Sequence, residues 1–107
     1  MYETIPLDLL AESAREQYNT AILQKKRGDI KEAFTFFRIA SQKYEELARM
    51  TSLTAERLDY LEMQRECLEN TLAYTLGSSY WIGAMLRIKD IADTVDAMTE
   101  DDDGERK

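Results

Sequence analysis

Apolar residues recur every three or four positions through most of the chain, and this spacing predicts amphipathic helices. Within the first two helices, small residues alternate with large ones, at Ala14, Ala21, Ala33 and Ala40. Such alternation favours close helix contact, because the side chains of one helix interdigitate with those of the other. We place the helices at about 7–27, 29–50, 55–76 and 79–98. The pattern therefore predicts an all-α fold, an antiparallel up-down bundle of three to four helices.

The residues between the first two helices carry the signals of a tight turn. Gly28 can adopt the positive φ that a residue past a helix end often needs, and the basic residues just before it complement the helix dipole. Asp29 is a good N-cap for the next helix, and Glu32 three residues later completes a capping-box-like pattern. Because the end of the first helix, the turn and the start of the second helix follow one another directly, we expect the two helices to form a close antiparallel hairpin.

The third helix carries two adjacent apolar faces. Leucines form one face, and the other consists of Tyr60, Met63, Cys67 and Tyr74. Two faces are more than a helix needs to contact a single hairpin. We therefore expect helix 79–98 to cover the second face, in its own chain or in a second copy. Gly77 and the serines after it indicate a break before that helix, and one continuous helix over 55–98 is the alternative.

Composition and charge limit the classes of partner. Residues 99–107 are strongly acidic and contain no apolar side chain, so we predict a single helical domain over 1–98 and a disordered acidic tail. The net charge of -7 argues against binding to nucleic acid or to an anionic membrane, which needs a basic face. No apolar run is long enough to span a bilayer, and no signal peptide is recognisable. With a single cysteine, which fits a reducing compartment, the sequence predicts a cytoplasmic protein.

The residues give no support for catalysis. The chain has no histidine, which excludes His-based acid–base chemistry and His metal ligands. No activating partner is indicated for Cys67, and the acidic run 101–103 lacks the ligand spacing of a calcium-binding loop. No Gly-rich phosphate loop or dinucleotide fingerprint is present. We therefore expect a protein that is not an enzyme and that uses no cofactor and no metal.

The stretch that follows the turn resembles a pattern shared by two helical families, G-[DN]-Y-x-E-A-x-x-x-[FY]-x-x-A. The matching residues are Gly28, Asp29, Glu32, Ala33, Phe37 and Ala40. One family is the MIT (microtubule interacting and transport) domain, a three-helix bundle with a tight first turn, a short loop and a third helix of about this length. The other is the tetratricopeptide repeat. Because no second unit follows at a period of about 34 residues, a tetratricopeptide-like hairpin is the runner-up.

Resemblance to an MIT domain implies a non-catalytic protein–protein interaction module that binds a partner helix or peptide beside the third helix. The candidate partner-binding residues are Tyr60, Met63, Cys67, Tyr74 and Phe36. Phe36 is included because it lies roughly opposite the stripe of Ala33 and Phe37, and exposed aromatic residues are enriched at interfaces. The alternative function is that of a small self-associating bundle, a structural or accessory subunit that associates through the third and fourth helices.

Overall fold

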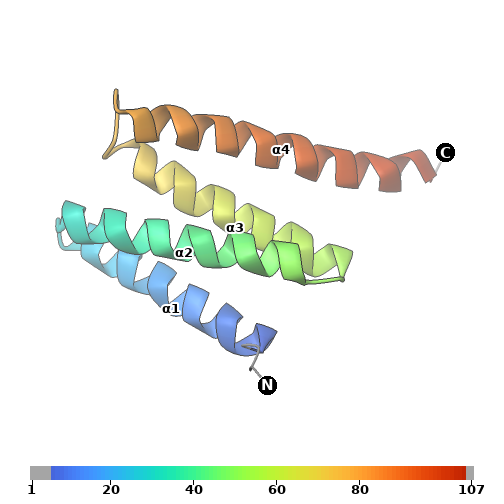
Figure 1. The fold of residues 1–107 in the computed structure, drawn as a ribbon, viewed down its shortest axis with the longest axis horizontal. Coiled ribbons are helices and arrows are strands. Elements are labelled where there is room, and N and C mark those ends of the chain that lie inside the picture. Colours follow the sequence, from blue (N-terminus) through green and yellow to red (C-terminus); the bar gives the residue numbers. More distant parts are fainter. Residues whose placement is uncertain (1–5, 106–107) are drawn as a thin grey trace, which may run out of the picture.

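The structure is a computed structural model that describes the backbone of residues 6–105 and the side chains of residues 6–99. Its helices are α1 (Leu7–Lys26), α2 (Ile30–Met50), α3 (Thr54–Leu72) and α4 (Ser79–Glu105), and no strand occurs in this part of the chain. Figure 1 shows that each helix runs antiparallel to the helix before it. The predicted all-α up-down bundle is therefore confirmed, with four helices.

The helices lie in chain order rather than in a closed ring. Contacts are made mainly between consecutive helices, so that α2 and α3 form a central pair. Helix α1 lies on one side of this pair and α4 on the other (Figure 1). This open order leaves one flank of α4 without a neighbouring helix.

The α1–α2 turn ends α1 with backbone hydrogen bonds. Gly28 has φ +81°, its N–H donates to the carbonyl of Lys25 at 3.1 Å, and the N–H of Asp29 donates to the carbonyl of Gln24 at 2.9 Å. This pair of bonds is the Schellman motif, which satisfies the last carbonyls of a helix. Asp29 does occupy the N-cap position of α2, but its side chain makes no capping hydrogen bond. The predicted capping box with Glu32 is therefore wrong; with ψ at 76°, Asp29 lies outside the extended conformation typical of a capping residue.

The main core lies between the α1–α2 hairpin and α3. Its buried side chains are Ala14, Ala21, Ala33, Phe37, Ala40, Tyr44, Leu47 and Cys67. Phe37, Leu47 and Cys67 are fully buried. Partly buried Met63 of α3 and Tyr74, which follows α3, pack against this core. The alanines let the helices approach closely, because they add little side-chain bulk at the contact.

Helix α4 packs on a different face of α3 from the one we predicted. A second cluster joins Leu61 and Leu68 of α3 to Ala84 and Ile91 of α4. The leucine face of α3 therefore contacts α4, whereas Cys67 lies in the main core. The expectation that the fourth helix covers the Tyr60, Met63, Cys67 and Tyr74 face is wrong: Met63, Cys67 and Tyr74 pack in or against the main core, and only Tyr60 also contacts the cluster that includes α4. The larger side chains of this face fill the space that the alanine-rich hairpin leaves open.

Residues 73–78 connect α3 to α4 and exclude a continuous helix over 55–98. Helix α3 ends at Leu72, before the predicted end at Leu76, as the chain tightens into turns in which Tyr74 N–H donates to the Thr71 carbonyl at 3.1 Å. Gly77 then takes φ +84°, a left-handed conformation that favours glycine. Leu76 consequently lies outside both helices and is 78% exposed.

Helix α4 continues beyond the predicted end at Met98 as far as Glu105. The prediction of disorder over 99–107 is therefore corrected for residues 99–105, and residues 106–107 lie outside the described part of the chain. Lack of apolar side chains removes a reason to pack, but it does not stop a helix, because each added residue gains another backbone hydrogen bond. No glycine or proline interrupts the sequence between Met98 and Gly104.

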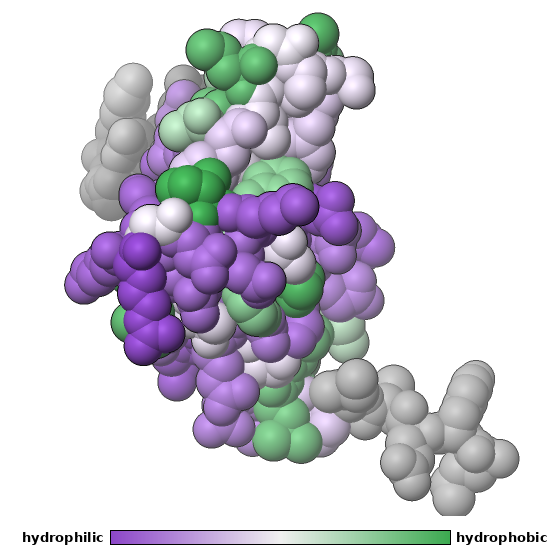
Figure 2. All heavy atoms as spheres, turned by 90° about the vertical axis from the view of Figure 1, so that its left-hand side faces the viewer, coloured by the Kyte–Doolittle hydropathy of each residue, from purple (hydrophilic) through white to green (hydrophobic). Residues whose placement is uncertain are grey.

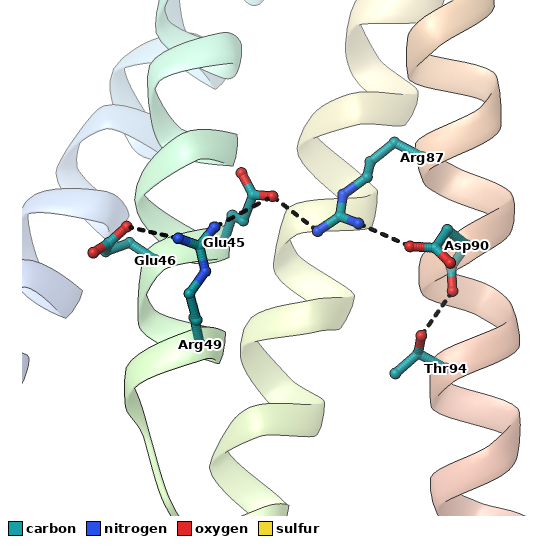
Figure 3. A network of polar contacts seen from close by, with 6 residues as sticks. All are labelled: Glu45, Glu46, Arg49, Arg87, Asp90 and Thr94. Carbon is teal, nitrogen blue, oxygen red and sulfur yellow. Dashed lines mark hydrogen bonds and ion pairs between the residues drawn. The ribbon is translucent and has the colours of Figure 1, made fainter.

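A polar network also holds α4 against α2 (Figure 3). The guanidinium of Arg87 on α4 contacts Glu45 of α2 at 2.9 Å and Asp90 of its own helix at 2.8 Å. Glu45 in turn lies 3.8 Å from Arg49. Two cavities of about 370 Å³ each lie along this contact. Beside them, the Oε1 atom of the buried Gln64 has no hydrogen-bond partner among the described residues. The α2–α4 contact is therefore more polar than the main core.

Candidate functional site

An open groove runs between α1 and α3, with α2 beneath it. The groove encloses a cavity of about 380 Å³. It is lined by Ala11, Arg15, Tyr18, Asn19, Tyr44, Asp59, Tyr60 and Met63. Residues of α1 and α3 form its two walls and Tyr44 of α2 forms its floor, so three helices contribute to a single surface.

Three of the eight residues that line the groove are tyrosines. The rings of Tyr44 and Tyr60 lie 6.3 Å apart, centroid to centroid, and are tilted by 31°. Tyr18 packs edge-on against the core ring of Phe37 at 6.1 Å, and its hydroxyl donates a hydrogen bond to the carboxylate of Glu66. These contacts fix the rings in place, so the lining is formed before any ligand binds.

The three tyrosines remain uncharged at neutral pH. Burial, followed by the hydrogen bond to Glu66, raises the pKa of Tyr18 to about 12. Burial is also the main cause of the raised pKa of Tyr44 and of Tyr60. Uncharged tyrosine rings suit the apolar side chains of a peptide, and their hydroxyls can hydrogen-bond its polar backbone.

Each rim of the groove carries one exposed charge. Arg15 lies on the α1 side and Asp59 on the α3 side. Neither forms an ion pair among the residues whose side chains the structure describes. Both charges are thus available to a ligand, and their opposite signs would orient a segment with an uneven charge distribution.

The structure brings two of the five predicted binding residues into this groove. Tyr60 and Met63 line it. Cys67 is fully buried in the main core, where burial raises the pKa of its thiol to about 12. Tyr74 and Phe36 are partly buried against that core, and neither lines the groove.

The contribution of α1 to the groove was missed by the sequence reasoning. Tyr18 and Tyr44 belong to the apolar stripes of their helices, and this pattern indicated only that they face inward. Arg15 and Asp59 are surface charges with no distinguishing spacing. The sequence signal that could have indicated the groove was the number of tyrosines on the inward faces of the helices. Tyrosine is favoured at sites where the ring is in apolar surroundings and the hydroxyl reaches solvent.

The described part of the chain contains no group of three His, Cys, Asp or Glu residues that could hold a metal ion. Nor is any helix of that part both long enough and apolar enough to cross a membrane. The turn residues Gly28, Asp29, Ala33, Phe37 and Ala40 shape the hairpin on which α3 packs. In comparisons with known proteins, no family model, no curated protein and no solved structure matches this chain.

Proposed function

We propose that this protein is a non-catalytic interaction module that binds a short segment of a partner protein in the α1–α3 groove. The observation that carries the proposal is a preformed groove lined by Tyr18, Tyr44, Tyr60 and Met63. Each rim carries a charge that has no ion-pair partner among the described side chains. Its volume lies within the range of roughly 300–1,000 Å³ typical of ligand sites. The resemblance of residues 28–40 to MIT domains supports binding beside the third helix, and we expect the partner to be cytoplasmic.

The chemistry of the groove defines the ligand that fits it. An apolar side chain such as leucine or methionine would occupy the cavity between Tyr60 and Met63, where it would displace water from apolar surface. An acidic residue on one side of this anchor would pair with Arg15, and a basic residue on the other side with Asp59. The proposed ligand is therefore a short amphipathic segment with one apolar anchor and charges of opposite sign around it.

This proposal is tested with peptides selected on the intact protein from a random display library. Affinity is then measured by fluorescence anisotropy for the wild-type protein and for Met63→Lys. The substitution places a charge in the groove and should weaken binding at least about tenfold. Met50→Lys is the matched control, because Met50 is an exposed methionine at the end of α2, away from the groove.

Thermal unfolding of both variants, followed by circular dichroism, separates loss of binding from loss of fold. The proposal requires that Met63→Lys remain folded and bind weakly while Met50→Lys binds as the wild type does. Equal affinities for the two variants, or a library that yields no binding peptide, would show that the groove is not a peptide site.

A further inference from the structure

The α3–α4 connection and the first turns of α4 expose four large apolar side chains close together in sequence, which we call the α4 face. Its members are Leu76, Ile82, Met85 and Leu86. Leu76 is 78% exposed, Leu86 is 64% exposed and Ile82 is 56% exposed. Positions 82, 85 and 86 follow helical spacing and so lie on one side of α4.

The other large exposed apolar side chains lie singly or in pairs on other elements. Leu9, Leu23, Ile30, Met50 and Leu53 are spread over α1, α2 and the α2–α3 loop. Scattered single residues of this kind are normal on a protein surface, whereas a contiguous apolar patch marks an interaction site. Figure 2 shows the same end of the molecule, with weakly polar and apolar residues gathered in the upper part and hydrophilic residues below them.

We propose that the α4 face binds the α4 face of a second copy of this chain, with the two α4 helices antiparallel. The charges along α4 support this occupant and this orientation. After the α4 face, Asp90 pairs with Arg87 and Asp93 with Lys89. Beyond these pairs the helix carries Asp96, and the sequence from residue 100 to residue 105 adds five more acidic residues and no basic one. The second half of α4 is thus strongly negative.

A basic cluster lies at the end of the bundle where α4 begins. It consists of Lys25, Lys26, Arg27 and Lys31, which are all exposed at the α1–α2 turn. These four basic residues outnumber the two exposed acidic residues of the same turn, Asp29 and Glu32. Figure 1 shows this turn and the start of α4 at the same end of the molecule, and the C-terminal end of α4 at the opposite end. Each copy therefore carries its basic cluster at the end of the bundle where α4 begins, and the acidic half of α4 runs toward the other end (Figure 1).

Antiparallel packing brings these opposite charges toward each other. When two α4 faces meet, the acidic half of each α4 runs past the connection of its partner, toward the partner's basic end. Parallel packing would instead place the two acidic halves side by side, where like charges repel. The apolar cluster thus supplies the attraction, and the charge distribution selects the orientation.

The contact surface of one helix pair is small, so the dimer should be weak and form in the micromolar range rather than the nanomolar range. The α4 face shares no residue with the α1–α3 groove. A failure of this inference would therefore leave the peptide-binding proposal unaffected, and each can be tested alone.

Sedimentation equilibrium of the full chain over a range of concentrations tests the dimer. The wild type should show reversible dimerisation, and Leu86→Glu should raise the dissociation constant at least about tenfold. Leu9→Glu is the matched control, because it makes the same change at another leucine, 55% exposed and on α1, and should leave dimerisation unchanged. A wild type that stays monomeric to millimolar concentration, or equal effects of the two substitutions, would overturn the inference.

A spin label attached through Ala97→Cys tests the orientation, since Ala97 is exposed on the acidic half of α4. With a rise of about 1.5 Å per residue, antiparallel helices that meet near residue 84 would place the two labels about 40 Å apart. Parallel helices would bring them within about 20 Å. Pulsed dipolar spectroscopy distinguishes the two results, and the short distance would overturn the antiparallel arrangement.

Discussion

Cys67 offers a direct test of how α3 packs, because its thiol is fully buried between α3 and the α1–α2 hairpin. Burial, with the nearby carboxylate of Glu66, raises the pKa of this thiol from 9.0 to about 12. Only the thiolate reacts with a disulfide reagent, so near pH 8 this difference lowers the reactive fraction about a thousandfold. Exclusion of the reagent by the core slows the reaction further, so labelling should require an opening of the bundle.

The assay follows the reaction of native protein with a chromogenic disulfide reagent near pH 8. The same protein in concentrated guanidinium chloride gives the rate of a free thiol, and Ala97→Cys provides an exposed thiol within the folded protein. We expect Cys67 to react at least about a thousandfold more slowly in the native state than in denaturant. A native rate within tenfold of the denatured rate would refute the placement of the Cys67 face against the hairpin.

Three further predictions concern stability and use urea unfolding as the measurement. Gly28→Ala should destabilise the protein by about 1–2 kcal/mol, because alanine would have to adopt the positive φ of this position. An unchanged unfolding midpoint would exclude the Schellman turn. Gly83 lies within α4 with open space around it, so Gly83→Ala should instead stabilise the protein by up to about 1 kcal/mol. Arg87→Ala should lower the free energy of unfolding by less than about 1 kcal/mol, since the ion pair of Arg87 with Glu45 is partly exposed. A larger decrease would show that the polar network is the main contact that holds α4 on the bundle. Folding raises the pKa of Cys67 and of Tyr18 to about 12 and so favours their protonated forms. Their contribution to stability should therefore be fully present below about pH 9 and be lost as the pH rises toward 12. An unfolding midpoint that does not change between pH 8 and pH 11 would contradict these pKa shifts.

The sequence predicted those features of the fold that depend on neighbouring residues. Helical spacing located all four helices, and the Lys-Lys-Arg-Gly run located a turn in which Gly28 does have positive φ. The end of α4 was not predictable from its apolar stripe, because a helix can continue after its packing contacts stop. The capping role of Asp29 also failed, since backbone hydrogen bonds at the end of α1 fix the geometry of that turn.

Features that depend on which helices become neighbours were harder to predict from the sequence. The pattern showed that α3 has two apolar faces, but periodicity alone does not say which face meets the hairpin and which meets α4. The groove depends on the separation of α1 and α3 as well, so Tyr60 and Met63 were predicted while Tyr18 and Arg15 were not. Residues on one helix follow from its spacing, whereas a site shared by three helices follows from their arrangement in space.

Chemical-shift mapping tests the proposed function most directly. The ¹⁵N-labelled full chain is titrated with a library-selected peptide, and the perturbed backbone amides are placed on the structure. The account predicts that the largest changes fall on both walls of the groove, at Arg15 and Tyr18 of α1 and at Tyr60 and Met63 of α3. Changes concentrated instead on the exposed residues of α4, with α1 unaffected, would contradict the assignment of the groove as the binding site.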